Sequence, residues 1–264
     1  MLNTNDCVLN YEALSVLAKL VEEKGSHPMK KVDLTGAFSS LEDVDYEVQG
    51  EIKMCLVMVL DALKTTRVEE LVLKRCELDE HCATELSQSL SEMPELKVLD
   101  LHDTTLKEGS LKLIARALQQ SQVKLTKLDI SKNSDILLGD TASYLANYVS
   151  KIDTLIDFDM SEVESADSSA IADICTSLKP SAAHGRLTSL NISNIFCCQS
   201  EGVNAIVDLL KVSKSLTYLD ISYLNLSKKR QHMAIVEALC ESASAKTLTT
   251  LKKSDTEVPA TVAR

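Results

Sequence analysis

A short pattern of apolar residues, L-x-x-L-x-L, returns seven times along the chain, with another apolar residue at times in place of leucine. Successive copies begin 28, 29, 30, 32, 29 and 32 residues apart. A nearly fixed spacing of about 20 to 50 residues is typical of proteins that stack copies of one structural unit. The copies begin at Val68, Leu96, Leu125, Leu155, Leu187, Leu216 and Leu248, the last of which opens a partial copy.

Each copy predicts a strand that is followed by a helix. Leu99 and Leu101 are separated by the polar Asp100, and this period of two is expected of a strand with one buried face. After the strand, apolar residues recur at the spacing of a helix and form one stripe. In this copy the stripe consists of Leu111, Ile114, Ala115 and Leu118.

Stacking allows units of this size to fold. A unit of about 30 residues cannot bury both of its apolar faces, because domains below about 40 residues usually need a staple or a partner. Neighbouring units bury these faces against each other, with parallel strands along one wall and helices along the other. Strands pair at about 4.8 Å, whereas a helix is about 10 Å wide. The pattern therefore predicts an α/β solenoid, a curved right-handed horseshoe with parallel strands on its concave face and helices on its convex face.

Several residues strengthen this interpretation. Gly109 and Gly202 lie near the predicted helix starts, and Cys76 and Asn133 lie three positions beyond the last strand leucine of their copies. With these features the chain resembles the leucine-rich repeat family, in the long, helix-containing type of ribonuclease inhibitor and the Ran GTPase-activating proteins. The resemblance implies that Cys76 and Asn133 bond the turn backbone. Later copies depart from this pattern, and we expect their turns to satisfy the backbone in another way: they carry Val163, Ile195 and Leu224.

We interpret residues 1–264 as a single repeat domain, because no linker interrupts the period. Residues 29–251 hold about seven repeats. A capping helix over residues 11–23 is expected within residues 1–28, and residues 252–264 are expected to form a loose tail. The sequence contains neither a signal peptide nor a run of about 18 apolar residues, so we expect no membrane contact.

Eight cysteines bear on the compartment of the protein. Two pairs, Cys76 with Cys82 and Cys197 with Cys198, lack the C-x-x-C spacing of a metal or redox site. Together with the lack of a signal sequence, this favours a reduced, cytoplasmic protein over a disulfide-bonded secreted one. Three cysteines fall on predicted helices and are expected to be buried as small apolar groups: Cys55, Cys175 and Cys240.

Two columns of polar side chains are expected on the exposed face of the strands. The residue between the two strand leucines is mostly a carboxylate, and the residue two positions later is mostly a hydroxyl. Carboxylates on neighbouring strands repel by about 1 kcal/mol per pair even in water. Basic residues relieve this repulsion in the middle repeats, but we expect no such relief near Asp159. The first column is Asp33, Val72, Asp100, Asp129, Asp159, Asn191 and Asp220; the second is Thr35, Lys74, His102, Ser131, Ser161, Ser193 and Ser222.

These columns admit two interpretations. In the first, Asp followed by Ser repeats the commonest strand text of the family and forms a solvated ladder without a ligand. In the second, the ladder attracts a basic protein, in keeping with a net charge of −11, which also argues against nucleic acid. Tyr218 and Tyr223 would then act as anchors beside Asp220, because tyrosine is favoured at interfaces; otherwise they are ordinary surface tyrosines. The candidate partner-binding residues are Asp100, His102, Asp129, Asp159, Asp220, Tyr218 and Tyr223.

Catalytic constellations are nearly absent from the sequence. No H-E-x-x-H, G-x-S-x-G, Walker or dinucleotide motif accompanies the five histidines, so we expect no catalytic residue, no cofactor and no metal. His102 beside Asp103 is interpreted as a solvated pair rather than an acid–base pair.

Three functions fit these features. The favoured one is a non-enzymatic module that offers a preformed wall to a protein partner. The resemblance adds a GTPase regulator similar to the Ran activators, although Lys252, Lys253 and Arg264 stand where that family carries a long acidic tail. It also adds an inhibitor similar to ribonuclease inhibitor, which the lack of tryptophan and the fewer repeats disfavour. The oligomeric state stays open, because an incomplete last repeat leaves an edge strand.

Overall fold

The structure is a computed structural model of the 264-residue chain. The predicted capping helix, apart from Val16 and Lys19, lies outside the described residues, as do Cys197, Cys198 and the predicted tail beyond Ser254. The chain divides into two compact units, residues 1–133 and 134–264, and each is described by itself. The structure describes residues 2–3, 16, 19, 29–37, 46–134, 136–138, 140–163, 168–195, 200–224, 226 and 229–254.

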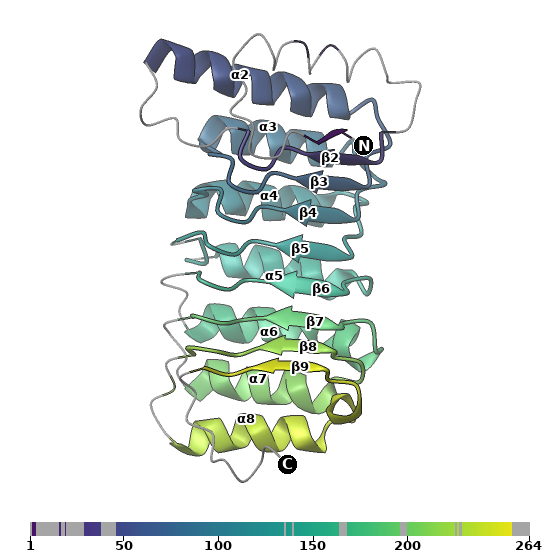
Figure 1. Cartoon of the computed structure of the whole chain (residues 1–264), viewed down its shortest axis with the longest axis vertical. Coiled ribbons are helices and arrows are strands. Elements are labelled where there is room, and N and C mark those ends of the chain that lie inside the picture. The colour runs from purple at the N-terminus through teal and green to yellow at the C-terminus, as the bar shows by residue number, and fades with distance from the viewer. Residues whose placement is uncertain are drawn as a thin grey trace. The chain divides into compact units, whose positions relative to one another are not determined.

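In the first unit, parallel strands pair in chain order (Figure 1). The middle residues of successive strands lie opposite each other, as in the pairing of Leu71 with Leu99 and of Leu99 with Leu128. The strands are β1 (Leu2–Asn3), β2 (Lys31–Asp33), β3 (Glu70–Val72), β4 (Val98–Asp100) and β5 (Lys127–Asp129). The helices are α2 (Tyr46–Leu63), α3 (Glu80–Leu90) and α4 (Glu108–Gln120).

The second unit repeats this arrangement. Its strands are again parallel and in chain order, with Phe158 opposite Leu190 and Leu219 opposite Leu251. The strands are β6 (Asp157–Asp159), β7 (Ser189–Asn191), β8 (Tyr218–Asp220) and β9 (Thr250–Lys252). The helices are α5 (Thr141–Lys151), α6 (Ser168–Ala183), α7 (Ser200–Val212), α8 (Lys229–Glu241) and the short 3-10 helix η2 (Ala243–Lys246).

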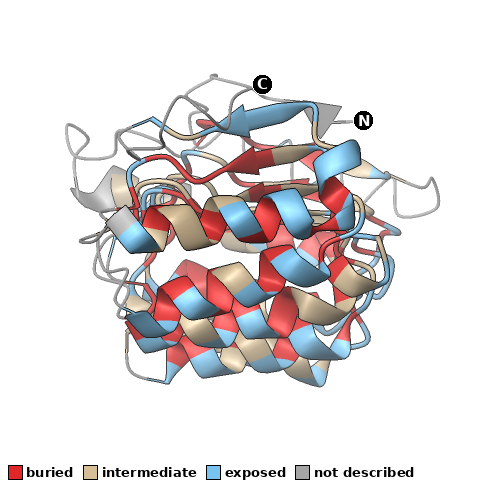
Figure 2. Ribbon diagram, turned by 90° about the horizontal axis from the view of Figure 1, so that it is seen from below, coloured by how far each residue is buried: buried red, intermediate tan, exposed pale blue. Residues whose placement is uncertain are grey.

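The core of each unit lies between its strands and its helices. The predicted stripe of α4 is buried along its whole length, and the helices carry buried residues on one side and exposed residues on the other (Figure 2). Phe158 and Met160, which replace the two strand leucines in an irregular copy, are fully buried. A parallel strand thus alternates with a helix at the spacing of the leucine pattern, and the predicted α/β leucine-rich repeat fold is confirmed. The curvature of the stack stays a prediction.

The turn after each of the strands β2 to β8 contains a residue with left-handed backbone at the same repeat position. In six of these residues the N–H donates to a carbonyl of the next repeat of the same unit, for example from Arg75 to His102 at 2.9 Å and from Tyr223 to Ser254 at 3.0 Å; the others are Gly36, Asp103, Glu162 and Asn194. This backbone ladder continues past the strands whatever side chain follows. These residues are Gly36, Arg75, Asp103, Lys132, Glu162, Asn194 and Tyr223, with φ between 55° and 70°.

The later turns carry an apolar residue at the position of Cys76 and Asn133. Val163, Ile195 and Leu224 are all buried as core residues, and the residue before each makes the backbone bond to the next repeat. That these turns satisfy their other backbone groups by different means stays a prediction. In the first unit, Asn133 makes the bonds that the family resemblance implies. Its Nδ2 donates to the carbonyl of Leu101 at 2.8 Å, and its Oδ1 accepts from three groups: Thr104 N, Thr104 Oγ1 and Leu106 N, each at 3.1 Å.

The cysteines follow the predicted pattern with one exception. Cys76 Sγ donates to the carbonyl of Leu34 at 3.0 Å, and burial together with Asp79 raises the pKa of Cys82 to about 12. Cys240 was expected to be buried, but it lies on the exposed side of α8, so that prediction was wrong. The cysteines in the described residues are free thiols: Cys55, Cys76, Cys82, Cys175 and Cys240.

No helix in the described ranges is long and apolar enough to cross a membrane.

Candidate functional site

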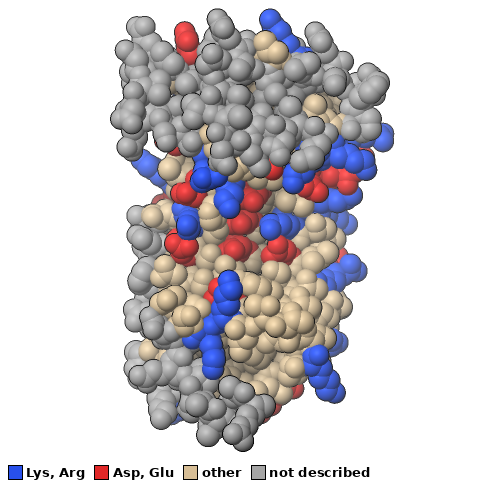
Figure 3. Space-filling model, in the orientation of Figure 1, with Lys and Arg blue, Asp and Glu red and all other residues tan. Residues whose placement is uncertain are grey.

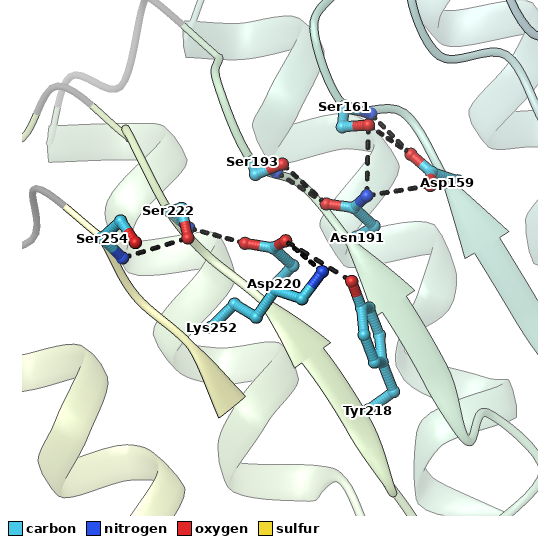
Figure 4. A network of polar contacts seen from close by, with 9 residues as sticks. All are labelled: Asp159, Ser161, Asn191, Ser193, Tyr218, Asp220, Ser222, Lys252 and Ser254. Atoms are coloured by element: carbon cyan, nitrogen blue, oxygen red, sulfur yellow. Dashed lines mark hydrogen bonds and ion pairs between the residues drawn. The ribbon is translucent and has the colours of Figure 1, made fainter. Parts of the chain in front are cut away.

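The candidate residues fall into two groups, one in each unit. Asp100, His102 and Asp129 lie on or just after β4 and β5 of the first unit. In the second unit, Tyr218 and Asp220 lie on β8, with the other two candidates, Asp159 and Tyr223, on β6 and in the turn after β8. We call the first group, with Ser131, the first-unit cluster. The second-unit network consists of Asp159, Ser161, Asn191, Ser193, Tyr218, Asp220, Ser222, Lys252 and Ser254 (Figure 4).

The repeated Asp-x-Ser sequence has a local structural cause. Oδ1 of Asp129 accepts the backbone N–H of Ser131 at 3.0 Å and also the hydroxyl of Ser131. Short polar side chains commonly bond the backbone two residues on, which fixes the turn. One carboxylate oxygen therefore serves the turn. The same backbone bond joins Asp33 to Thr35, Asp100 to His102, Asp159 to Ser161 and Asp220 to Ser222, at 2.9 to 3.2 Å.

The first-unit cluster holds two carboxylates side by side. Asp100 and Asp129 are paired in the parallel register, and Asp129 is only 9% exposed. Burial raises the pKa of Asp129, and the neighbouring Asp100 raises it further, while the bonds from Ser131 oppose the shift. The predicted repulsion between neighbouring carboxylates therefore acts between Asp100 and Asp129.

His102 contacts the next repeat from within this cluster. Its Nδ1 lies 2.8 Å from Oγ of Ser131, and its backbone N–H donates to Asp100. The ring is thereby positioned by a hydroxyl, and the interpretation of His102 and Asp103 as a solvated pair stays a prediction.

In the second-unit network, an amide separates the carboxylates. Asn191 Nδ2 donates to Oδ2 of Asp159 at 2.8 Å and to Oγ of Ser161 at 3.1 Å (Figure 4). Its Oδ1 accepts from the backbone N–H of Ser193 at 3.1 Å, as the aspartates do in their own turns. Asn191 thus gives Asp159 an uncharged donor, and Asp159 is also among the groups that raise the pKa of Lys252. Asn191 was placed in the column from sequence but was not chosen as a site residue.

Tyr218, Asp220 and Lys252 meet at the other side of Asn191. The hydroxyl of Tyr218 donates to Oδ2 of Asp220 at 3.4 Å, and Nζ of Lys252 lies 3.8 Å from the same oxygen. Lys252 also lies 5.3 Å from the centre of the Tyr218 ring, a distance typical of cation–π contact. Tyr218 and then Asp220 raise the pKa of Lys252. Tyr223, in the left-handed turn, is 48% exposed.

Lys252 and Ser254 were missed because the segment after Leu251 was interpreted as a tail. In the structure Lys252 belongs to β9 and pairs with Asp220, and the N–H of Ser254 donates to Oγ of Ser222 at 3.1 Å. The period could have found them, since both lie 32 residues after their counterparts in the preceding copy.

The outward strand columns differ in charge between the units. In the first unit, the outward residues on and just after the strands include four acidic side chains, Asp33, Glu70, Asp100 and Asp129. They also include three lysines, Lys31, Lys74 and Lys127, of which Lys31 bridges to Glu70 at 3.2 Å. In the second, they hold three aspartates and Lys252 among hydroxyl and amide side chains. Basic and acidic atoms mingle on the strand face of the first unit, while the second is mostly uncharged (Figure 3). The predicted carboxylate ladder is interrupted by Val72 in the first unit and by Asn191 in the second.

No group of three His, Cys, Asp or Glu side chains that could hold a metal ion occurs in the part of the chain that the structure describes.

No protein-family model and no curated protein sequence matches the chain. Similar solved structures include leiomodin-1 actin-binding site 2, with 14% identity over 71% of this chain and 88% of that one and a TM-score of 0.41. The tropomodulin C-terminal domain of Caenorhabditis elegans is 10% identical over 86% of this chain and 92% of that one, with a TM-score of 0.35. TLR13 in complex with ssRNA13 is 18% identical over 73% of this chain and 22% of that one, with a TM-score of 0.41.

Proposed function

We propose that the chain is a non-enzymatic protein-interaction module that binds a basic protein partner through the outward face of its strands. Each complete repeat contains a helix of 11 to 18 residues, which supports the long repeat type of ribonuclease inhibitor and the Ran GTPase-activating proteins.

Preorganisation of the strand face carries this proposal. The outward aspartates are fixed by bonds to their own turns, and Asn191 and His102 tie neighbouring repeats together. A surface whose side chains are already immobilised loses less conformational entropy when a partner binds. Such a face is suited to recognition of a folded protein surface.

Tyr218, Asp220 and Tyr223 are the proposed anchor. Aromatic side chains dominate many interfaces, and an adjacent carboxylate adds a charged contact for a lysine or arginine of the partner. Asp159 extends this contact along the second unit. Asp100, His102 and Asp129 would supply the corresponding contacts on the first unit. A net charge of −11 on the whole chain supports attraction of a cationic partner.

Affinity capture from cytosol tests this proposal. The double variant Tyr218→Ala with Tyr223→Ala should recover at least about tenfold less of the partner than the wild type, as expected for the loss of interface hot spots. Tyr144→Ala is the matched control, because it removes a half-buried tyrosine from helix α5 of the same unit. Equal recovery by wild type and double variant, with both folded by circular dichroism, would exclude this anchor.

A further inference from the structure

The middle residue of strand β9 is exposed, whereas the middle residue of every other strand with described side chains is buried. Its middle residue, Leu251, is 39% exposed, whereas the equivalent Leu190 and Leu219 are fully buried. All three residues of β9 are exposed, and no strand follows it in the described ranges. The repeat core is therefore open at this end of the second unit.

The backbone of β9 also has an open edge. Thr250 donates to the carbonyl of Thr217 at 2.9 Å, and the carbonyl of Lys252 accepts from Ile221 at 3.0 Å, so these two residues face β8. Backbone groups of alternate residues point to opposite sides of a strand in a parallel ladder. The N–H and C=O of Leu251 consequently point away from β8, toward the position of a further strand.

This end of the acidic chain is basic. Residues 229–254 contain five basic and two acidic side chains, a net charge of +3, within a chain of net charge −11. Lys252 lies on the strand itself, and Lys246 lies exposed on η2 just before it. An open edge with basic side chains favours an acidic occupant over a basic one.

We propose that β9 accepts an extended acidic segment of a partner protein as an added parallel strand. The register defines the sequence that fits. In the column of Asp159, Asn191, Asp220 and Lys252, the next residue lies beside Lys252, where an aspartate or glutamate would pair with its ammonium group. The flanking residues should be apolar, because their side chains would cover Leu251. The expected segment has the pattern apolar-x-x-apolar-Asp-apolar.

Strand addition accounts for both features of this edge. The main-chain bonds supply affinity, and the alternating side chains supply specificity. A lysine on an edge strand can also act only as protection against unwanted pairing. In that case no acidic peptide would bind to β9, and the experiment below separates the two roles.

The test uses the full chain and a fluorescent 12-residue synthetic peptide that contains L-T-S-L-D-L, with a second peptide that carries Lys in place of Asp. Fluorescence anisotropy gives the affinities, and amide hydrogen exchange reports on Leu251. We expect the aspartate peptide to bind at least about tenfold more tightly and to slow exchange at Leu251 by about tenfold or more. The variant Lys252→Glu should reverse the preference between the peptides.

Leu251→Pro gives an independent arm. It removes the N–H of Leu251, which points away from β8, so no bond to β8 is lost. Proline is tolerated on the free edge of a strand. It should abolish peptide binding, whereas Leu251→Ala, which keeps the N–H, should retain part of it. Binding that is indifferent to Leu251→Pro and Lys252→Glu would overturn the proposal, as would a Leu251 amide that is already protected in the free protein. Lys252→Glu also removes the contacts of Lys252 with Tyr218 and Asp220 of the proposed anchor. Leu251→Pro and Leu251→Ala leave those three residues unchanged, so the comparison of these two variants separates the two proposals.

Discussion

Asp159 and Asp220 divide their two carboxylate oxygens between two tasks. Oδ1 of Asp159 closes the turn by accepting from Ser161, and Oδ2 faces the next repeat, where Asn191 donates to it. Asn191 shows that an amide closes the turn equally well, since its own Oδ1 accepts from Ser193. Charge at these positions is therefore separable from the turn structure.

Asp129→Asn should raise the free energy of unfolding at pH 7, by up to about 1 kcal/mol, because it removes repulsion from Asp100 and keeps the acceptor for Ser131. Burial raises the pKa of Asp129, so the stability linked to its protonation is present below the unfolded pKa and is lost as pH rises through the folded pKa. The gain of the variant should therefore shrink on acidification. Urea unfolding at pH 7 and pH 4 measures both effects.

Asp159→Asn is the matched control for that experiment. Its new amide would face Nδ2 of Asn191, so the variant should lose a bond rather than gain stability. A stabilised Asp159→Asn, or an Asp129→Asn that is no more stable than the wild type at pH 7, would contradict the role assigned to these carboxylates.

Thiol reactivity should separate Cys240 from Cys82. Cys240 is exposed on α8, whereas Cys82 is buried and its pKa is raised to about 12. Thiolate is the reactive species, so N-ethylmaleimide should modify Cys240 at least about 100-fold faster at pH 7.5. Mass spectrometry of the labelled peptides measures the two rates. Comparable rates in the native protein would mean that Cys82 is accessible.

At the scale of elements, helices α6 and α7 approach closely at a glycine. The N–H of Gly202 donates to Oγ of Ser168 at 2.9 Å, and a Cβ on Gly202 would lie 3.0 Å from that oxygen and 3.3 Å from the carbonyl of Ser168. At the start of α4, a Cβ on Gly109 would meet nothing within 4 Å. The two glycines that mark helix starts in the sequence thus have different roles.

Gly202→Ala should lower the free energy of unfolding by about 1 to 3 kcal/mol, the usual cost of overpacking a buried contact. Gly109→Ala should leave it unchanged or raise it by up to about 1 kcal/mol, because alanine favours the helix and has room. Chemical denaturation of the two variants measures the difference. Equal changes in the free energy of unfolding would show that the close contact between α6 and α7 at Gly202 leaves room for a methyl group.

The apolar pattern predicts elements well because inward positions depend on the repeat itself. The buried stripe of α4 and the strand leucines were predicted from spacing alone. Outward contacts depend on the neighbouring repeat, so the bonds of Asn191 and Lys252 could not be predicted from one copy. Strand β1 at Leu2–Asn3 was also missed, since two residues carry no pattern. The exposed position of Cys240 was missed because a cysteine in a helical stretch gives no sign of which side it occupies.

At the scale of the whole molecule, charge should govern partner recovery. The net charge of −11 and the aspartates of the strand face attract a cationic partner, and added salt screens that attraction. Raising sodium chloride from about 50 to about 500 mM should reduce the amount of captured partner severalfold. Quantitative mass spectrometry of the eluates measures this. Recovery that is constant across the salt series would exclude charge as the main attraction.

A triple variant gives the matching change in the protein. Asp129→Asn, Asp159→Asn and Asp220→Asn together remove three charges from the strand columns of the two units. At low salt, this variant should recover less partner than the wild type, and at high salt the two should converge. If both recover the same partner at low salt, the aspartate columns are not the binding surface.

The left-handed turns have a consequence for how such a chain diversifies. Six successive repeats place six different residue types at this position, from Arg75 to Tyr223. The main chain makes the same bond to the next repeat from Arg75, Asp103, Glu162, Asn194 and Tyr223. The side chain at this turn position can therefore be replaced without loss of the backbone bond between repeats. Selection could change the binding specificity of the molecule one repeat at a time.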